Sequence, residues 1–157
     1  MYLRKHGDSS TQREIERVIL DELKQRFCAE DWMENITLPL PFKSDVQIKP
    51  DFYSEKHKII GEIHAHLGKL KSAQMHKVAA DILKLHLFDP DHAYQKYFVV
   101  CDQDEYKQLR GNSYLAAAIS QFDIDLICIE LDENRRADLQ NAMKRQNMFR
   151  DSSTSSE

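Results

Sequence analysis

Residues 46–68 constrain the fold most, because their pattern predicts two strands joined by a short polar turn. Side chains of a strand alternate between the two faces of a sheet, so residues two apart share a face. Asp51 is predicted on the first strand. Glu62, His64 and His66 are predicted on one face of the second. Two carboxylates brought together on neighbouring strands commonly hold a hard divalent cation.

The rest of the chain alternates between helical and strand patterns. Apolar spacing predicts helices over 11–27, 72–88, 105–121 with an interruption near Gly111, and 133–148. Strand composition marks 36–42, 97–101 and 124–130, the last two as buried strands, whereas 29–35 is expected to be a connector. Two prolines place 36–42 at an edge or a strand end. Thr11 and Glu14 match a capping box, which predicts a helix start at Thr11.

This order predicts an α/β fold with a mixed central sheet flanked by helices. The length of 157 residues favours one domain, expected over residues 11–150, after a polar lead-in at 1–10 and before a disordered tail at 151–157. A net charge of −4 gives no global basic signature, so any nucleic-acid binding must use a local patch.

Cysteine usage and hydropathy indicate the compartment. Three widely spaced cysteines without a CxxC pair favour reduced thiols in a cytosolic protein. No apolar run is long enough to span a bilayer, and the first ten residues lack the apolar stretch of a secretory signal. A cytoplasmic protein without membrane contact is therefore expected.

Pro50-Asp51, ten intervening residues and Glu62-Ile63-His64 resemble the motif of the PD-(D/E)XK nuclease superfamily. His64 stands where that pattern has lysine. The first six expected elements, α-β-β-β-α-β, are also the common core of the restriction-endonuclease-like fold, and a basic, Gln-containing helix follows the second motif strand. The resemblance covers roughly residues 11–102 and implies that core plus a C-terminal helix-strand-helix.

The resemblance implies a nuclease that hydrolyses DNA phosphodiester bonds with Mg²⁺ or Mn²⁺. Asp51, Glu62 and the backbone carbonyl of Ile63 would be the metal ligands. His64 would take the place of the lysine as a base, although imidazole, with a reference pKa of ~6.5 against ~10.4 for Lys, is mostly uncharged at neutral pH. Lys49, expected on the same strand face as Asp51, is the alternative source of an ammonium group.

Further residues have roles that the resemblance implies. Gln74, one turn into the second helix, is expected to reach the active site, as in the recombination-nuclease branch. Glu14 is a candidate for the acidic residue that many members carry on the first helix, and its capping role explains it equally well. Three lysines are candidate contacts for DNA phosphates, although such lysines are usually only solvated: Lys69, Lys71 and Lys77.

Other interpretations stay open. The missing lysine and the acidic net charge also fit a catalytically inactive nuclease-like domain that binds nucleic acid or protein and serves a regulatory role. His64 and His66, joined by Glu62, also fit a zinc or manganese site. In the plainest interpretation Asp51 is a surface acid near a turn and Glu62 faces solvent. Similar small nucleases suggest a homodimer, and a protein partner could supply DNA targeting.

Overall fold

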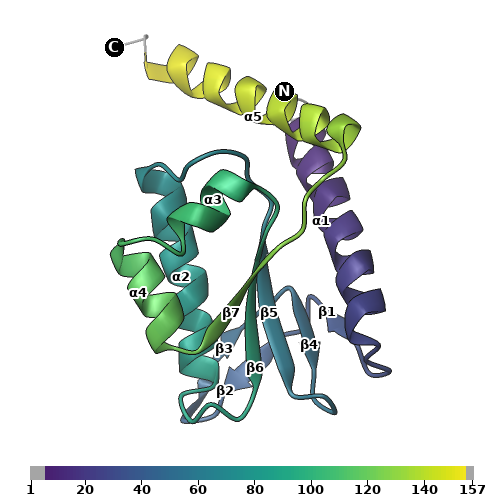
Figure 1. Ribbon diagram of the computed structural model, residues 1–157, viewed down its shortest axis with the longest axis vertical. Coiled ribbons are helices and arrows are strands. Elements are labelled where there is room, and N and C mark those ends of the chain that lie inside the picture. Colours follow the sequence, from purple (N-terminus) through teal and green to yellow (C-terminus); the bar gives the residue numbers. More distant parts are fainter. Residues whose placement is uncertain (1–5, 155–157) are drawn as a thin grey trace.

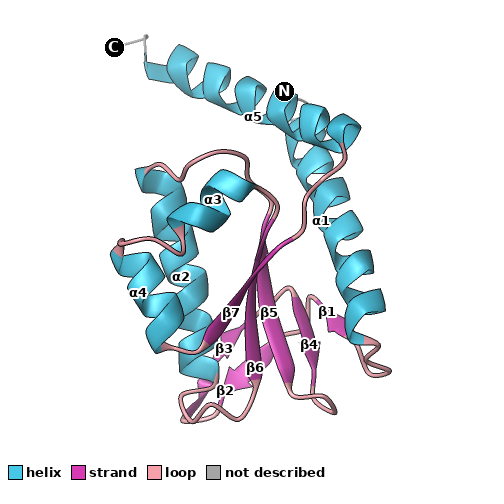
Figure 2. Ribbon diagram, in the orientation of Figure 1, coloured by secondary structure: helices cyan, strands magenta, loops and turns pink. Residues whose placement is uncertain are grey.

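The computed structural model describes the backbone of residues 6–154 and the side chains of residues 10–148. A five-stranded mixed sheet in the order β1-β4-β5-β6-β7 forms the centre (Figures 1 and 2). Its antiparallel half contains β1 (Met33–Glu34), β4 (Phe52–Ser54) and β5 (Ile59–His64). Its parallel half adds β6 (Gln95–Val100) and β7 (Ile124–Cys128). A separate two-stranded sheet pairs β2 (Leu38–Leu40) with β3 (Lys43–Ile48).

Five helices surround the central sheet within the described residues. One face is covered by α1 (His6–Phe27), whose buried side chains pack against Phe52, Ile59 and Ile63. The other face is covered by α2 (Ser72–Phe88), α3 (Gln103–Gln108) and α4 (Tyr114–Gln121). The last helix, α5 (Glu133–Thr154), crosses beyond the end of the sheet and contacts α1 (Figure 1).

Strand β5 is buried along its whole length, because helices cover both of its faces. Ile59 and Ile63 point into the cluster under α1, and Ile60 points into the cluster under α2. Gly61 lies opposite Phe52 on β4, and a Cβ atom at Gly61 would lie 2.0 Å from the Cζ atom of Phe52. The absence of a side chain at Gly61 therefore lets the ring of Phe52 lie directly on β5.

Several expected elements are confirmed. The helix at Ser72–Phe88 has the predicted ends, and the interruption near Gly111 separates α3 from α4. The polar turn falls between β4 and β5, as expected. Strand β6 is buried at every position from Lys96 to Val100. The mixed sheet flanked by helices is the predicted fold class.

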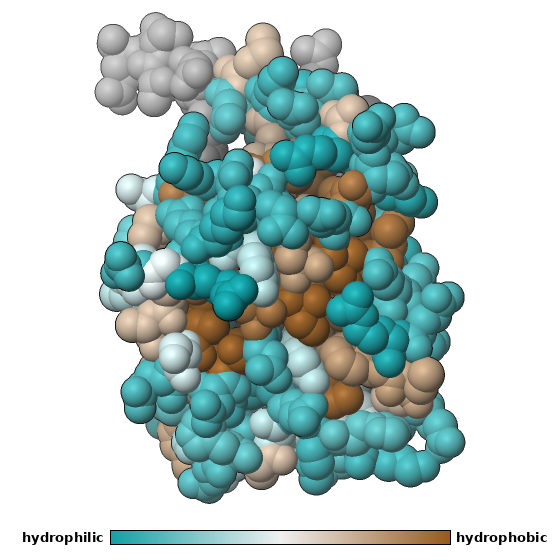
Figure 3. Space-filling model, in the orientation of Figure 1, coloured by the Kyte–Doolittle hydropathy of each residue, from teal (hydrophilic) through white to brown (hydrophobic). Residues whose placement is uncertain are grey.

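Burial of the strand at 124–130 on both faces is a wrong prediction, because β7 is an edge strand in which Asp125 is exposed and residues 126–128 are only partly covered. Figure 3 shows hydrophobic residues gathered across the middle of the face seen there.

The first strand of the predicted hairpin is not continuous in the structure. Strand β3 ends at Ile48 and β4 begins at Phe52, so Lys49, Pro50 and Asp51 form a connection between two different sheets. Proline has no N–H to donate to a ladder, which favours a break at this point. Asp51 therefore lies just before its strand, and the expectation that Lys49 shares a strand face with it fails.

The first strand of the central sheet also comes from an unexpected place. Strand β1 lies in segment 29–35, which was predicted to be a connector, whereas the predicted strand at 36–42 forms β2 of the smaller sheet and the turn after it. Strand β1 pairs with β4 in antiparallel register, with Met33 opposite Tyr53 and Glu34 opposite Phe52. Two residues are too short a run for strand periodicity to mark in the sequence.

Both chain ends differ from expectation. Helix α1 begins at His6, so Thr11 lies inside it and the predicted capping box with Glu14 is wrong. The lead-in is thus helical from residue 6, and residues 1–5 lie outside the described part. The disordered tail is wrong for residues 151–154, which belong to α5, and residues 155–157 are not described. None of the described helices has the length and apolar composition needed to cross a membrane.

Candidate functional site

Asp51 and Glu62 lie together where β4 begins and β5 approaches its carboxyl end. The backbone N–H of Asp51 donates to the carbonyl of Gly61 at 3.1 Å, and the Asp51 carboxylate accepts the N–H of Ile63 at 2.7 Å. These two bonds bracket Glu62 on β5, so the backbone of β5 fixes Asp51 beside it. The predicted pairing of the two acids is thus a feature of the structure, although Asp51 precedes its strand.

Glu62 is buried, with 4% of its surface exposed, so the interpretation of a solvent-facing acid fails. Burial is the largest of the causes that together raise the pKa of Glu62 to about 9, and the charges of Asp51 and Asp81 act in the same direction. Lys84 opposes them: its Nζ lies 3.4 Å from Oε1 of Glu62 and 2.9 Å from Oδ1 of Asp81. Oε1 of Glu62 nevertheless has no hydrogen-bond partner among the described residues.

A further carboxylate comes from α1. Burial, followed by the charge of Asp51, raises the pKa of Glu16, whereas Lys77 and Arg13 lower it. Glu16 is partly buried and near Asp51, while Glu14 is exposed. Among the described side chains of α1, the acid that lies near Asp51 is therefore Glu16.

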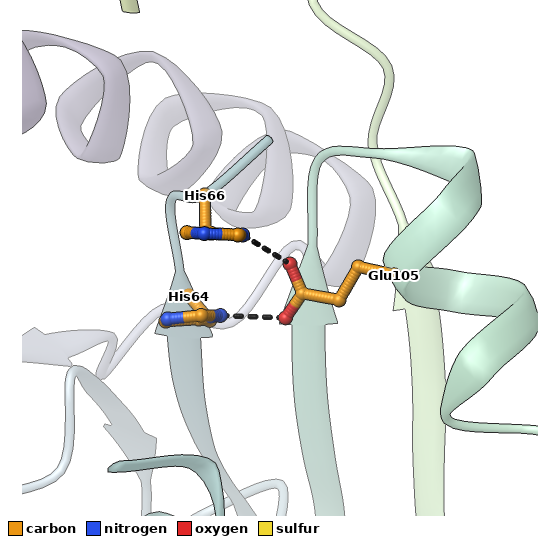
Figure 4. A group of neighbouring side chains, drawn as sticks. All are labelled: His64, His66 and Glu105. Atoms are coloured by element: carbon orange, nitrogen blue, oxygen red, sulfur yellow. Dashed lines mark hydrogen bonds and ion pairs between the residues drawn. The ribbon is translucent and has the colours of Figure 1, made fainter. Parts of the chain in front are cut away.

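Two imidazoles and a third buried acid form a second group (Figure 4). Nδ1 of His64 lies 2.5 Å from Oε1 of Glu105, and Nδ1 of His66 lies 3.6 Å from Oε2 of the same carboxylate. The two rings are parallel, with centroids 5.2 Å apart and planes 8° apart. Glu62, which was expected to join the two histidines, is instead held toward Asp51 and Lys84.

A cleft of about 570 Å³ opens beyond the carboxyl end of β5, between the start of α2 and helix α5. Gln74 lines it and accepts a hydrogen bond from the N–H of Lys71 at 2.8 Å, so its carbonyl oxygen caps the first turn of α2. The polar and charged residues of its lining come from four segments: Gln12, His64, His66, Lys69, Lys71, Gln74, Lys77, Gln146 and Asn147.

The structure gathers most of the predicted residues into one region. Asp51, Glu62 and the backbone of Ile63 form one group. The three candidate lysines, Gln74 and His64 line the cleft, and neither Asp51 nor Glu62 belongs to its lining. Lys49 is exposed in the connection before Asp51, and no described contact joins it to either acid.

Four residues of the region escaped sequence reasoning: Glu16, Asp81, Lys84 and Glu105. A spacing of four and then three residues places Lys77, Asp81 and Lys84 on one face of a helix. This spacing is visible in the sequence and could have predicted that the three side chains lie together. Glu105 closely follows β6, the parallel neighbour of β5. Polar residues after neighbouring parallel strands meet at one sheet edge, which is a second usable signal.

No protein-family model, curated protein or solved structure matches this chain. Function is therefore inferred from the chemistry of the site.

Proposed function

We propose that the protein is a metal-dependent nuclease that hydrolyses phosphodiester bonds in DNA and has a restriction-endonuclease-like core. The observation that carries the proposal is the meeting of the partly buried Asp51 with the buried Glu62, on the strand whose last residue, His64, lines the cleft of the three lysines. The order of elements supports it, since α1 precedes an antiparallel β1-β4-β5 meander, and α2 leads from β5 to the parallel strand β6.

The residues present fit a hard divalent cation. Within the described residues, the buried Oε1 atom of Glu62 has no hydrogen bond and lies 3.4 Å from the Nζ atom of Lys84, and a second carboxylate, Asp51, lies beside it. Two carboxylates in a desolvated place repel one another unless a cation or a proton separates them. Asp51 and Glu62 would hold Mg²⁺ or Mn²⁺, with the carbonyl of Ile63 as the third expected ligand. Such an ion stabilises charge in the transition state and lowers the pKa of a bound water.

The chain supplies an ammonium group from α2 rather than from β3. Lys84 bridges Glu62 and Asp81, and both acids raise its pKa against the opposing effect of burial. A lysine held there can orient a water or neutralise a developing negative charge. We therefore assign to Lys84 the role that was considered for Lys49. His64 keeps the position of the motif lysine, with its Nδ1 atom directed at Glu105.

The cleft supports contact with the DNA backbone in spite of the negative net charge. Lys69, Lys71 and Lys77 line it together with the start of α2. The N-terminus of a helix carries partial positive charge and unsatisfied N–H groups, which favours phosphate oxygens. A local basic cleft of this kind is the arrangement that an acidic protein needs in order to bind DNA.

Cleavage of linear, nicked, branched and single-stranded DNA with Mg²⁺ or Mn²⁺ tests the proposal. We expect metal-dependent cleavage that Asp51→Asn and Glu62→Gln abolish and that Glu14→Gln, an exposed acid on α1, leaves intact. Cleavage that persists in both site variants would exclude this site. No cleavage of any substrate by the wild type would reject the nuclease, and DNA binding without cleavage would instead support the inactive, DNA-binding module.

The salt dependence of DNA binding tests the role of the cleft. The logarithm of the DNA-binding constant falls as the logarithm of the salt concentration rises, and each lost phosphate contact makes this slope less steep by about 0.9 for duplex DNA. The double variant Lys69→Gln/Lys71→Gln should therefore reduce the magnitude of the slope by up to about 2. Lys43→Gln, an exposed lysine on β3, is the control and should leave the slope unchanged. Equal slopes for all three proteins would contradict binding in this cleft.

A further inference from the structure

His64, His66 and Glu105 form a compact group of potential metal ligands at the carboxyl ends of two parallel strands. His64 is the last residue of β5, and Glu105 lies in α3, which follows β6. One ligand atom from each residue lies within 4.8 Å of the others. We propose that this group binds one divalent transition-metal ion, of the class of Zn²⁺, at a site distinct from the Asp51–Glu62 pair.

The first support is that the group contains buried polar atoms without hydrogen bonds. Nδ1 of His66 and Oε2 of Glu105 are both buried and have no partner among the described residues. The distance of 3.6 Å between them is too long for a hydrogen bond. An unsatisfied buried polar atom costs about 1–3 kcal/mol, so native structures rarely leave one without a partner. A cation bound to these atoms would satisfy them together.

The second support is the charge of Glu105, whose surface is fully buried. Within the described residues, the two histidines are the only groups that form ion pairs with Glu105, and each is a cation only when it is protonated. Arg136 forms its ion pair with Asp102, three residues before Glu105 in the chain, at 3.1 Å. A buried carboxylate without a cation is expensive, and metal coordination is one of the accepted ways in which proteins hold such a group.

The third support is the distance between the ligand atoms. Imidazole nitrogen and carboxylate oxygen bind Zn²⁺ at about 2.0–2.2 Å in tetrahedral geometry, so two ligands of one ion lie about 3.3–3.6 Å apart. The distance of 3.6 Å between Nδ1 of His66 and Oε2 of Glu105 already matches that separation. The limit of 4.8 Å for the whole group requires a contraction of about 1.2 Å or a change of side-chain rotamer. The parallel stacking of the two imidazoles already directs one nitrogen of each toward Glu105 (Figure 4).

The donor set selects the class of metal. Two imidazoles and one carboxylate suit Zn²⁺ and the neighbouring first-row ions, whereas Mg²⁺ prefers oxygen ligands and keeps several waters. The two sites would therefore choose different ions, with Mg²⁺ at the carboxylate pair and Zn²⁺ at the histidines. Cys101 is not a member of the ligand set, and its thiol donates a hydrogen bond to the backbone carbonyl of His66 at 3.5 Å.

Three protein ligands leave at least one coordination position for a water or a substrate atom, which is the pattern of catalytic rather than structural zinc sites. His64 and His66 line the cleft, so that position would open toward the lysines and the start of α2. The site would thus take Zn²⁺ with an exchangeable ligand. It stands on its own contacts and does not require that the protein be a nuclease.

Titration of metal-free protein with Co²⁺, followed by its visible absorption, and calorimetry with Zn²⁺ test the proposal. We expect one ion per chain. His66→Gln and Glu105→Gln, checked for folding by circular dichroism, should each weaken Zn²⁺ binding by more than about 100-fold, which exceeds the 10–100-fold loss typical of an outer-shell partner. His76→Gln, an exposed histidine on α2, should bind as the wild type does.

Absence of Zn²⁺ and Co²⁺ binding in the wild type would overturn the proposal, and so would an equal loss in the His76→Gln control. Asp51→Asn separates the two sites: the Co²⁺ spectrum should persist in this variant while Mg²⁺-dependent cleavage is lost. Loss of the Co²⁺ spectrum in Asp51→Asn would reject a separate site. A wild type that binds Co²⁺ but cleaves no DNA would reject the nuclease and retain the metal site.

Discussion

Replacement of Glu62 by glutamine should stabilise the metal-free protein at neutral pH. Burial, Asp51 and Asp81 raise the pKa of Glu62 from 4.5 to about 9, so the native protein binds a proton there that the unfolded chain releases. A group of this kind contributes stability that is fully present below pH 4.5 and is lost as the pH rises through about 9. Between those values the native state becomes less stable as the pH increases.

The magnitude follows from the linkage between protons and folding. Each pH unit in this window costs about 1.4 kcal/mol of stability, so a rise from about pH 5 to about pH 7.5 costs roughly 3 kcal/mol. Glutamine has nearly the same shape and cannot ionise, so the variant avoids this loss. The unfolding free energy of Glu62→Gln minus that of the wild type should therefore increase by roughly 3 kcal/mol over the same pH range.

Urea denaturation in the presence of a chelator, repeated across that pH range, measures the difference. Glu14→Gln is the matched control, because the same change is made at an exposed position, and its difference from the wild type should stay constant. A difference that is also constant for Glu62→Gln would refute the reasoning about desolvation. Addition of Mg²⁺ should reverse the order of stability if the ion binds Glu62, because binding to the native state alone stabilises it.

Three further predictions concern the structure around the site. Gly61→Ala should lower the unfolding free energy measured in urea by about 3 kcal/mol, because the added Cβ would lie 2.0 Å from Cζ of Phe52. The double variant Gly61→Ala/Phe52→Leu should recover part of that loss. An unchanged stability of Gly61→Ala would contradict this packing of Phe52 on β5. Lys96→Met should lower the unfolding free energy by about 3 kcal/mol, measured by thermal or urea denaturation. The Nζ atom of Lys96 lies 3.0 Å from the Asp89 carboxylate, and the variant leaves that carboxylate buried without its cation. An unchanged unfolding free energy would show that the ion pair is dispensable. Burial raises the pKa of the Cys101 thiol to about 12, so mass spectrometry after alkylation at pH 8 should find it unmodified until denaturant is added.

The sequence located the pairing of the two acids because strand chemistry is local. Alternation along Ile59–His64 and a polar turn of a few residues were enough to bring Asp51 near Glu62, although Asp51 precedes β4. The helix at Ser72–Phe88 was equally readable, since its apolar spacing and the Asp89-Pro90 stop are contained in one stretch. The mixed sheet flanked by helices followed from the order of these local patterns.

Only the tertiary structure decided which distant groups complete the site. Glu105 meets His64 because β5 and β6 are parallel neighbours, and residues 41 positions apart then share one edge of the sheet. Glu16 lies near Asp51 and Lys84 lies near Glu62, because α1 and α2 cover opposite faces of the sheet and the rotation of each helix about its axis turns these side chains toward the acids. Helical periodicity shows which residues share a face but not which strand residue that face meets, because packing in three dimensions fixes the contact.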